Sequence, residues 1–445
     1  MNNLDKIFKA YDIRGIYPEE INEEIAYKIG RATAEFLETK EIVVGRDNRL
    51  SSEDLFKALS EGIRDEGVDV IDIGLTTTPM FYFAVTKWGL GAGIMITASH
   101  NPKEYNGFKV VRDKARSVAE GSGLEKIKNL AEKDKFKEKN RGQLIKKEVL
   151  ENYLEHNFSF IDTNDIKPLK IVVDTTNGVG GLIIPEIAKR LPINLIHLFA
   201  ELDGSFPNHD PNPALSENTR ILEQRVLSEK ADLGIAFDGD GDRIIFFDEK
   251  GERIPPDLIS VLLINYFFKN VGKLLYTASN SRLVREEIEK NGNTAVCSKV
   301  GHAFIKEKME KQKIAFAGES SGHYYFRDNY YIDSPIIVLL KILEIISVQR
   351  IPISVLLGSF EKYYRQRFDF EIDKDINKII EKVEKEYKKT AKISRFDGLT
   401  IEYPAWWFNL RASNTEPLLR LTIEANSKEL LNEKIKEIKA ILSSF

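Results

Sequence analysis

The 445-residue chain has little cysteine, no strong excess of charge of either sign and no long apolar run. Its single cysteine, Cys297, excludes an internal disulfide framework and a metal site built from several thiolates, and it fits a reducing compartment. Lys and Arg number 65 and Asp and Glu 69, so the formal net charge is −4. Because a large nucleic-acid surface needs a basic excess, we expect no nucleic-acid partner.

The apolar stretches are too short to cross a membrane. A spanning helix needs about 18 or more predominantly apolar residues, and the longest candidate, residues 334–348, is interrupted by Lys341 and Glu344. We predict a core helix there. The N-terminal residues contain no basic segment followed by an apolar one, so no signal peptide is expected. These absences predict a cytoplasmic protein with no membrane partner, and they leave the oligomeric state open.

Strands alternate with helical segments through most of the chain. Helices are expected at residues 21–39 and between Ser51, as N-cap, and Gly67, with strands at 41–45, 68–73 and 93–97. A further helix is expected to open at residues 78–79. The alternation restarts with strands at 170–174 and 233–237, and again with strands at 274–277, 294–297 and 314–317. This pattern predicts three related α/β units, each with a mainly parallel or mixed sheet.

The pattern changes after about residue 365. Strand-like runs at 399–403, 408–411 and 418–424 are flanked by helical segments at 375–388 and 428–442, which predicts a small two-layer α+β domain. The charge-rich stretch 132–147 is interpreted as a solvated face or linker. The expected domains are residues 1–150, 151–252, 253–365 and 366–445.

A serine turn follows the expected strand at 93–97. Residues 97–102 read Thr-Ala-Ser-His-Asn-Pro, and Pro102 prevents the turn from continuing as a helix. Ligand sites of α/β proteins lie at such strand ends, where Ser99 can act as a nucleophile or carry a phosphoryl group and His100 could donate to the phosphate. The same residues also suit a turn that hydrogen-bonds only to itself, and the motif alone leaves both interpretations open.

Three carboxylates alternate with small residues after the strand at 233–237. Asp238, Asp240 and Asp242 are separated by glycines that let the backbone curl, so that their oxygens can converge on Mg²⁺ or Mn²⁺. An EF-hand is rejected, because Arg243 stands where that loop requires glycine and a strand-like run follows. A solvated acidic turn is the alternative. Three like charges placed together without a cation would be costly, which favours the metal site.

Two more polar loops follow strand-like segments. Residues 318–323, Gly-Glu-Ser-Ser-Gly-His, combine a carboxylate and hydroxyls that can grip vicinal sugar hydroxyls. Residues 411–417, Arg-Ala-Ser-Asn-Thr-Glu-Pro, supply donors that suit a phosphomonoester. Taken alone, residues 318–323 are also explained as a polar turn. The glycines at 178, 180 and 181 lack the dinucleotide-binding spacing, so they predict tight packing instead.

Taken together and in order, these motifs resemble those of the α-D-phosphohexomutase superfamily, of the phosphomannomutase/phosphoglucomutase type. The resemblance covers nearly the whole chain. The remaining motifs that carry it are residues 8–15 (Phe-Lys-Ala-Tyr-Asp-Ile-Arg-Gly), 44–49 (Val-Gly-Arg-Asp-Asn-Arg), 105–109 (Tyr-Asn-Gly-Phe-Lys), 203–209 (Asp-Gly-Ser-Phe-Pro-Asn-His) and 299–302 (Lys-Val-Gly-His).

The resemblance implies an α/β protein of four domains around a central cleft, with three related α/β units and a C-terminal two-layer α+β domain. It implies a Mg²⁺-dependent mutase that interconverts hexose 1-phosphate and 6-phosphate, of mannose or glucose, through a phosphoserine and a bisphosphorylated sugar. A trace of glucose 1,6-bisphosphate or mannose 1,6-bisphosphate is expected as activator.

The resemblance also implies roles for particular residues. Ser99 carries the phosphoryl group, and it holds Mg²⁺ together with Asp238, Asp240 and Asp242. The hydroxyl that attacks needs a proton acceptor, for which His323 or Lys109 could serve, with Arg14 and His100 as further catalytic groups. The substrate-binding residues are expected to be Tyr11, Arg243, His302, Glu319, Ser321, Arg411, Ser413, Asn414 and Thr415.

Two alternatives stay open. Phosphoglucosamine mutases typically carry Arg-Pro-Ser-Gly-Thr-Glu in the last motif, whereas residues 411–416 resemble the mannose/glucose branch. Some members carry a lysine near the sugar where this chain reads Tyr-Thr-Ala-Ser-Asn-Ser at 276–281, which leaves the preference between glucose and mannose undecided. A non-catalytic sugar-phosphate sensor on the same scaffold would be expected to lack Ser99 or the metal loop, and both are present.

Overall fold

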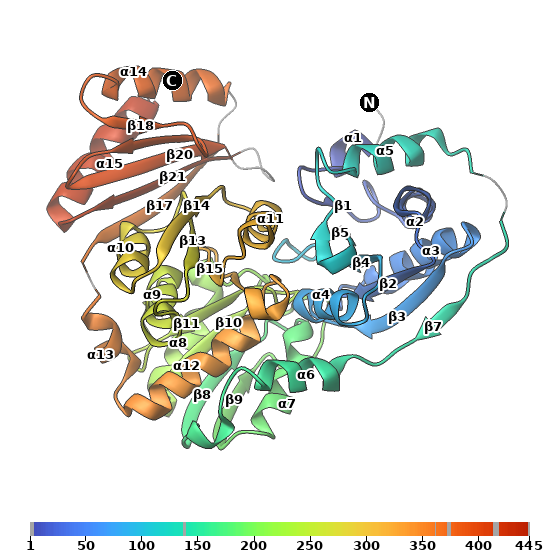
Figure 1. Ribbon diagram of the computed structural model, residues 1–445, viewed down its shortest axis with the longest axis horizontal. Helices are drawn as coiled ribbons and strands as arrows, with labels where there is room; N and C mark the ends of the chain where they lie inside the picture. The colour runs from blue at the N-terminus through green and yellow to red at the C-terminus, as the bar shows by residue number, and fades with distance from the viewer. Residues whose placement is uncertain (1–3, 137–138, 361, 372–374, 413–417, 444–445) are drawn as a thin grey trace. The chain divides into compact units, whose positions relative to one another are not determined.

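The computed structural model describes residues 4–136, 139–360, 362–371, 375–412 and 418–443. The chain forms two compact units. Unit 1 comprises Met1–Pro256 and Ser321–Leu356, and unit 2 comprises Asp257–Ser320 and Leu357–Phe445. Within the described residues the strands form four sheets with helices packed on them, so the predicted mixed α/β fold is confirmed (Figure 1).

The serine turn follows a strand of the first sheet of unit 1. Its strands lie in the order β1 (Ile13–Ile16), β5 (Tyr105–Arg112), β4 (Ala92–Ile96), β2 (Glu41–Arg46), β3 (Asp69–Leu75) and β7 (Leu144–Lys146), with β6 (Arg116–Ser117) beside β5. β2 is parallel to β3 and β4, whereas β5 is antiparallel to β4 and β1. The sheet is therefore mixed, and the turn that contains Ser99 follows β4.

Helices cover both faces of this sheet, which explains why β4 is buried at every position. On one face, apolar residues of β2 and β4 share a core with α2 (Glu23–Leu37), α3 (Ser52–Asp65) and α5 (Leu124–Lys133). On the other face, a Cβ added to Gly93 would meet Phe81 and Val85 of α4 (Thr78–Lys87). The short α1 (Leu4–Ile7) joins the first core.

The acidic loop, residues 238–243, follows a strand of the second sheet of unit 1. Its strands lie in the order β12 (Arg253–Ile254), β11 (Ile244–Phe247), β10 (Leu233–Phe237), β8 (Leu169–Asp174) and β9 (Ile193–Leu198). β8, β9 and β10 are parallel, and β11 turns back antiparallel to β10. The associated helices are α7 (Ile184–Ala188) and α8 (Arg220–Glu229). The hairpin between β10 and β11 places residues 238–243 at the carboxyl end of the parallel strands.

Unit 1 is completed by a segment that returns late in the chain. This segment contains β16 (Tyr324–Phe326), the apolar α12 (Pro335–Gln349) and the start of α13 (Ile353–Gly358). Its α12 packs on α6 (Leu150–Phe158), where the Ser334 hydroxyl donates to Asn157 Oδ1 over 2.7 Å. The core helix predicted at residues 334–348 is confirmed.

Unit 2 begins with a parallel sheet whose strands lie in the order β14 (Thr294–Ser298), β13 (Lys273–Thr277) and β15 (Phe316–Gly318). Its helices are α9 (Pro256–Phe267), α10 (Arg282–Lys290) and α11 (His302–Gln312). An antiparallel sheet follows, in the order β17 (Tyr364–Glu371), β21 (Leu418–Ala425), β20 (Trp406–Ala412), β19 (Leu399–Glu402) and β18 (Lys392–Ser394). Its core is shared with α14 (Ile376–Tyr387) and α15 (Lys428–Ser443), which confirms a two-layer C-terminal domain (Figure 1).

The structure adds detail to two local expectations. The charged stretch 132–147, interpreted as a solvated face or linker, contains an exposed edge strand, because Leu144–Lys146 pair with β3 as β7. The strand is exposed throughout, so its pairing depends on backbone hydrogen bonds that leave no apolar pattern. Ser51 precedes α3, but its side chain makes no capping bond, because its Oγ accepts from Asn106 Nδ2 at 2.8 Å.

Among the described residues, no helix combines the length and the apolar character needed to traverse a lipid bilayer.

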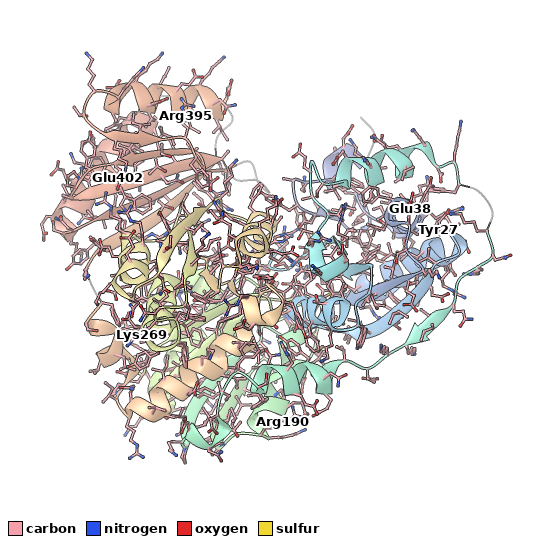
Figure 2. All side chains as sticks on the ribbon, viewed as in Figure 1. Tyr27, Glu38, Arg190, Lys269, Arg395 and Glu402 are labelled. Atoms are coloured by element: carbon pink, nitrogen blue, oxygen red, sulfur yellow. The ribbon has the colours of Figure 1, made fainter. Side chains whose placement is uncertain are left out.

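Helices α2 and α3 meet through glycines. A Cβ on Gly62 would lie 2.2 Å from the carbonyl oxygen of Tyr27, and one on Gly30 would lie 2.3 Å from that of Leu59. Tyr27, labelled in Figure 2, also donates from its hydroxyl to Asp65 Oδ2 over 2.9 Å. The two backbones therefore approach more closely than any larger residue allows.

We predict that Gly62→Ala destabilises the protein by about 1–3 kcal/mol, because backbone atoms that cannot rotate away must separate. This loss outweighs the gain of about 1 kcal/mol in helix propensity. Chemical denaturation measures the change. Glu61→Ala, an exposed neighbour on the same helix, is the control and should stay within about 0.5 kcal/mol of wild type. A Gly62→Ala protein as stable as this control would contradict the close approach.

Candidate active site

Ser99 follows β4 in a strained turn. Its backbone φ is +53°, in the left-handed region that costs most residues other than glycine about 1–2 kcal/mol. The Ser99 amide donates to Thr97 Oγ1 over 2.8 Å. Its hydroxyl donates to Asp238 Oδ2 over 3.1 Å, and it lies 3.3 Å from His100 Nδ1. The serine is only 2% exposed, so this turn does more than hydrogen-bond to itself: it presents the hydroxyl to a second loop.

The second loop holds the three aspartates. Asp238 and Asp240 are fully buried and Asp242 nearly so, and one ligand oxygen from each lies within 4.8 Å of the others. Asp238 Oδ1 accepts from the backbone amides of Asp242 and Arg243 at 3.1 and 3.2 Å. Gly241 has φ +65°, and a Cβ on Gly239 would meet the Ser99 carbonyl oxygen at 2.8 Å. The glycines therefore allow the predicted curl and the contact with the serine turn.

The donor set of this loop fits a divalent cation. Asp240 Oδ1 is buried and accepts no hydrogen bond from the described residues. Burial, reinforced by Asp242 and Asp240, raises the pKa of Asp238 well above its ordinary value, so the cluster gains by taking up positive charge. Carboxylate oxygens are the ligands that hard cations such as Mg²⁺ prefer. Asp238, Asp240 and Asp242 can thus hold a metal ion beside the Ser99 hydroxyl.

Positively charged side chains border the same carboxylates. Lys109 on β5 donates to Asp240 Oδ2 over 2.7 Å and to Asp242 Oδ2 over 2.8 Å. Burial alone would lower the pKa of Lys109, but these two carboxylates raise it well above its usual value. Arg243 Nε lies 3.6 Å from Asp238 Oδ2 and 3.8 Å from Asp242 Oδ1. A charged lysine and an arginine therefore balance part of the negative charge.

His323 approaches the acidic loop through Asp242. Its Nε2 lies 3.1 Å from Asp242 Oδ1, and its Nδ1 lies 2.9 Å from Ser321 Oγ. Burial would raise the pKa of Asp242, but Lys109 and His323 together hold it well below its ordinary value. Ser321, expected from the resemblance to bind sugar hydroxyls, thus orients His323 in this structure.

The other side of the serine turn is lined by Arg14 from β1. Its Nη1 donates to Asn101 Oδ1 over 2.6 Å, and its Nη2 pairs with Asp12. Burial, together with Arg243 and Arg14, lowers the pKa of His100 well below its ordinary value, so this imidazole is neutral. Tyr11 lies half-buried just before β1. Arg14 therefore joins the turn through a neighbour of Ser99.

Unit 2 contains the remaining predicted residues. Glu319 follows β15 and is buried, with its Oε1 accepting from the Gly301 amide at 3.1 Å. His302 is the first residue of α11, immediately after that glycine. The carboxylate predicted to grip a sugar is thus held at the start of the helix that His302 opens.

Arg411 lies near the end of β20, where its Nε is 3.9 Å from Asp397 Oδ2. The same Asp397 oxygen accepts from the Val300 amide at 2.9 Å, so Asp397 joins the loop that precedes α11 to the arginine. Ser413, Asn414 and Thr415, predicted to bind phosphate, lie outside the described residues.

One residue that contacts the aspartate cluster was missed by the sequence analysis. Thr78 donates from its hydroxyl to Asp240 Oδ2 over 2.6 Å, and its amide donates to the Asp240 carbonyl over 2.9 Å. The chain was expected only to begin a helix there, and α4 does begin at Thr78. A run of threonines, residues 76–78, at the end of a buried strand was the available signal.

This arrangement can support phosphoryl transfer. A hydroxyl lies against a cluster of buried oxygens that can hold a cation, with a lysine and arginines close by. Phosphoryl transfer requires mainly positioning and stabilisation of negative charge on oxygen, and these groups supply both.

Family models match nearly the whole chain, in order. The models are described as phosphoglucomutase/phosphomannomutase alpha/beta/alpha domain I at residues 5–138, domain II at 150–251 and domain III at 255–363. The C-terminal domain of the same family matches residues 371–441.

Relatives of known name match over their full length as well. The chain is 41% identical to a phosphomannomutase of Vibrio cholerae, covering 98% of both chains. It is 39% identical to phosphohexose mutases of Xanthomonas campestris pv. campestris, again covering 98% of both. Among solved structures, a phosphoglucomutase/phosphomannomutase family protein from Burkholderia thailandensis has a TM-score of 0.87 at 32% identity, covering 98% of this chain and 97% of that one.

Proposed function

The chain belongs to the phosphoglucomutase/phosphomannomutase family and is a phosphohexomutase, and we propose that it interconverts the 1- and 6-phosphates of mannose, of glucose or of both, with Ser99 as the phosphoryl carrier. The observation that carries this proposal is the Ser99 hydroxyl, held in a left-handed turn 3.1 Å from Asp238 of the buried aspartate cluster.

In the proposed cycle, phosphorylated Ser99 gives its phosphoryl group to the free hydroxyl of a hexose monophosphate. The P–O bond to Ser99 breaks as the bond to the sugar oxygen forms, and a bisphosphorylated sugar results. The other phosphoryl group of that sugar then passes back to Ser99. The products are the isomeric monophosphate and phosphorylated enzyme, so no phosphate is lost overall.

Asp238, Asp240 and Asp242 would hold Mg²⁺, to which the buried, unpaired Asp240 Oδ1 offers a ligand atom. When bound, the ion supplies Lewis-acid stabilisation of the charge on the transferring phosphoryl group. Thr78 and Lys109 both donate to Asp240 Oδ2 and thereby fix the orientation of its carboxylate. The loop is thus held in its binding geometry by the chain itself.

Proton transfer would be shared among the groups around the serine. His323 would accept a proton from the attacking sugar hydroxyl at Nδ1, because the Asp242 carboxylate takes the N–H of Nε2 and leaves Nδ1 as the basic nitrogen. Lys109 is held in its charged form by two carboxylates, so it suits the stabilisation of negative charge on the transferring phosphoryl group. His100 and Arg14 would orient the serine turn and its phosphate.

The family resemblance also assigns groups to the sugar and to its non-reacting phosphate. We propose that Glu319 and Ser321 bind sugar hydroxyls, because a buried carboxylate and a hydroxyl match vicinal hydroxyl groups. Arg411 would pair with the non-reacting phosphate. The further residues assigned to substrate binding are Tyr11, Arg243, His302, Ser413, Asn414 and Thr415.

A coupled assay with Mg²⁺ and a trace of glucose 1,6-bisphosphate tests the proposal. We expect turnover of mannose 1-phosphate, glucose 1-phosphate or both, and a lag or loss of rate when the bisphosphate is omitted, because an unphosphorylated serine must first be loaded. Glucosamine 1-phosphate is the third substrate. Turnover of the amino sugar alone would favour phosphoglucosamine mutase, and no turnover of any sugar by phosphorylated, metal-loaded protein would favour the sensor hypothesis.

A further inference from the structure

Two of the motifs that carry the family resemblance, residues 44–49 and 203–209, contain none of the residues assigned to catalysis or to substrate binding. Both lie in unit 1, and residues 203–209 contact the first motif at Arg49. The Arg49 side chain is 0% exposed, so it has no surface to offer a substrate. Its contacts show what it does instead.

Every N–H of the Arg49 guanidinium has an acceptor. Nη2 donates to the carbonyl oxygens of Ser99 and Asn101 over 2.9 and 2.6 Å. Nη1 donates to the carbonyl oxygens of Pro102 and Tyr105 over 2.6 and 3.0 Å. Arginine has five N–H donors in a rigid planar fork. Four of them hold carbonyl groups of the serine turn and of the residues that follow it.

The fifth donor anchors the guanidinium itself. Arg49 Nε donates to Asp47 Oδ2 over 3.2 Å. Asp47 is fixed in turn, because its Oδ1 accepts from the Ser52 hydroxyl at 2.6 Å and from the Arg49 amide at 3.1 Å. The guanidinium therefore bonds through Nε to Asp47, which lies between β2 and α3, and through Nη1 and Nη2 to the serine turn and the residues that follow it.

The second motif covers the guanidinium. The ring centroid of Phe206 lies 5.2 Å from Arg49 Cζ, a cation–π contact. Gly204 pairs with Arg49 through an isolated β-bridge, and a Cβ on Gly204 would lie 2.1 Å from the Asn48 carbonyl oxygen. Residues 203–209 thus press closely on the Asn48–Arg49 backbone and keep water from the buried cation.

We infer that Arg49, covered by Phe206, is a positioning residue for phosphoryl transfer: its four bonds to carbonyl oxygens hold the Ser99 turn in its left-handed conformation and aim the Ser99 oxygen at the aspartate cluster. The inference deepens the proposed function and rests on it, because it assumes that Ser99 carries the phosphoryl group. Lysine cannot replace this residue. A lysine has at most three donors and no planar fork, so at least one buried carbonyl of the turn would be left without its partner.

The test compares Arg49→Lys with wild type in steady-state turnover of the hexose 1-phosphate that the wild type uses fastest. Misplacement of a reacting group by about 1 Å costs roughly 100-fold in rate. We expect kcat to fall about 30- to 100-fold while KM stays within about two-fold, since Arg49 contacts no substrate. Single-turnover transfer from phosphorylated enzyme to hexose phosphate should slow by the same factor.

Arg46→Lys is the matched control. Arg46 lies in the same motif, and its side chain pairs with Asp72 at 3.0 Å and stacks on the Phe56 ring at 4.3 Å, but among the described residues it makes no hydrogen bond or ion pair with the serine turn. It should leave kcat within about two-fold of wild type. Mg²⁺ should raise the thermal midpoint of both variants, which shows that the aspartate cluster is intact.

Phe206→Leu keeps the inference testable if Arg49→Lys does not fold. It removes the aromatic face and retains apolar volume, and it should lower kcat about 3- to 10-fold without raising KM. A folded Arg49→Lys enzyme with wild-type kcat, or with raised KM and unchanged kcat, would overturn the inference while the proposed function stands. A wild-type enzyme inactive on every hexose phosphate would instead remove the proposed function, and this inference with it.

Discussion

Ser99→Ala is expected to lower hexose phosphate turnover by at least about 1,000-fold. Removing a nucleophile that forms a covalent intermediate removes the pathway itself, and comparable losses for nucleophile variants exceed that factor. The surrounding groups remain, but the Ser99 oxygen that contacts both Asp238 and His100 is lost. The coupled assay on mannose 1-phosphate and glucose 1-phosphate measures the loss.

Ser60→Ala provides the matched control. Ser60 is a buried serine on α3 in the same unit, and its hydroxyl has no hydrogen-bond partner in the part of the chain that the structure describes, so its removal should leave activity and stability near wild type. Labelled glucose 1,6-bisphosphate supplies a second measurement. Label should stay on wild type and on Ser60→Ala, and not on Ser99→Ala. A Ser99→Ala enzyme that keeps more than about a tenth of wild-type turnover would contradict the phosphoserine cycle.

Asp240→Asn is expected to lower Mg²⁺-dependent turnover by about 100- to 1,000-fold, and chelation of the metal should have a similar effect on wild type that added Mg²⁺ reverses. The magnitude follows from the loss of one preorganised electrostatic group at the reacting centre. Asp240 also accepts from both Thr78 and Lys109, so the amide replaces a carboxylate that fixes two neighbours.

Stability gives an independent readout for the same residue. A cation that binds only the folded protein stabilises it by about 2.7 kcal/mol when its concentration is about 100 times its dissociation constant. Mg²⁺ should therefore raise the thermal midpoint of wild type but not that of Asp240→Asn. Asp248→Asn, which changes a similarly buried aspartate outside the cluster, should respond to Mg²⁺ like wild type. Equal stabilisation of all three proteins would place the cation elsewhere.

The sequence predicts which strand ends carry the candidate loops, but it does not predict that the two loops contact each other. Residues 97–102 and 238–243 each follow an apolar strand, and this pattern placed both as candidate loops. They end two different sheets, and the Ser99–Asp238 contact joins residues 139 positions apart. No local periodicity encodes such a contact, so only the ordered set of motifs, through the family resemblance, brought the two loops together.

The supporting residues were harder to foresee for a related reason. Thr78 was expected to begin a helix and does so, yet its hydroxyl also holds Asp240. Ser51 has the residue type of an N-cap, but Asn106 from a distant strand takes up its oxygen. In each case tertiary contacts determine the partner, whereas local propensity predicts only the backbone conformation.

Residues 321–356 belong to unit 1 but are synthesised after Asp257–Ser320 of unit 2. This order has a consequence for folding during translation. Unit 1 cannot close its core when the ribosome has made Met1–Pro256, because α12 and His323 are still unmade and Asp257–Ser320 must be synthesised first. During that interval the α6 surface that packs against α12 is uncovered, and the contact between Asp242 and His323 has not yet formed. Translation proceeds at about 5–20 residues per second, so the nascent chain spends several seconds with an incomplete unit 1, the window in which chaperones would be needed.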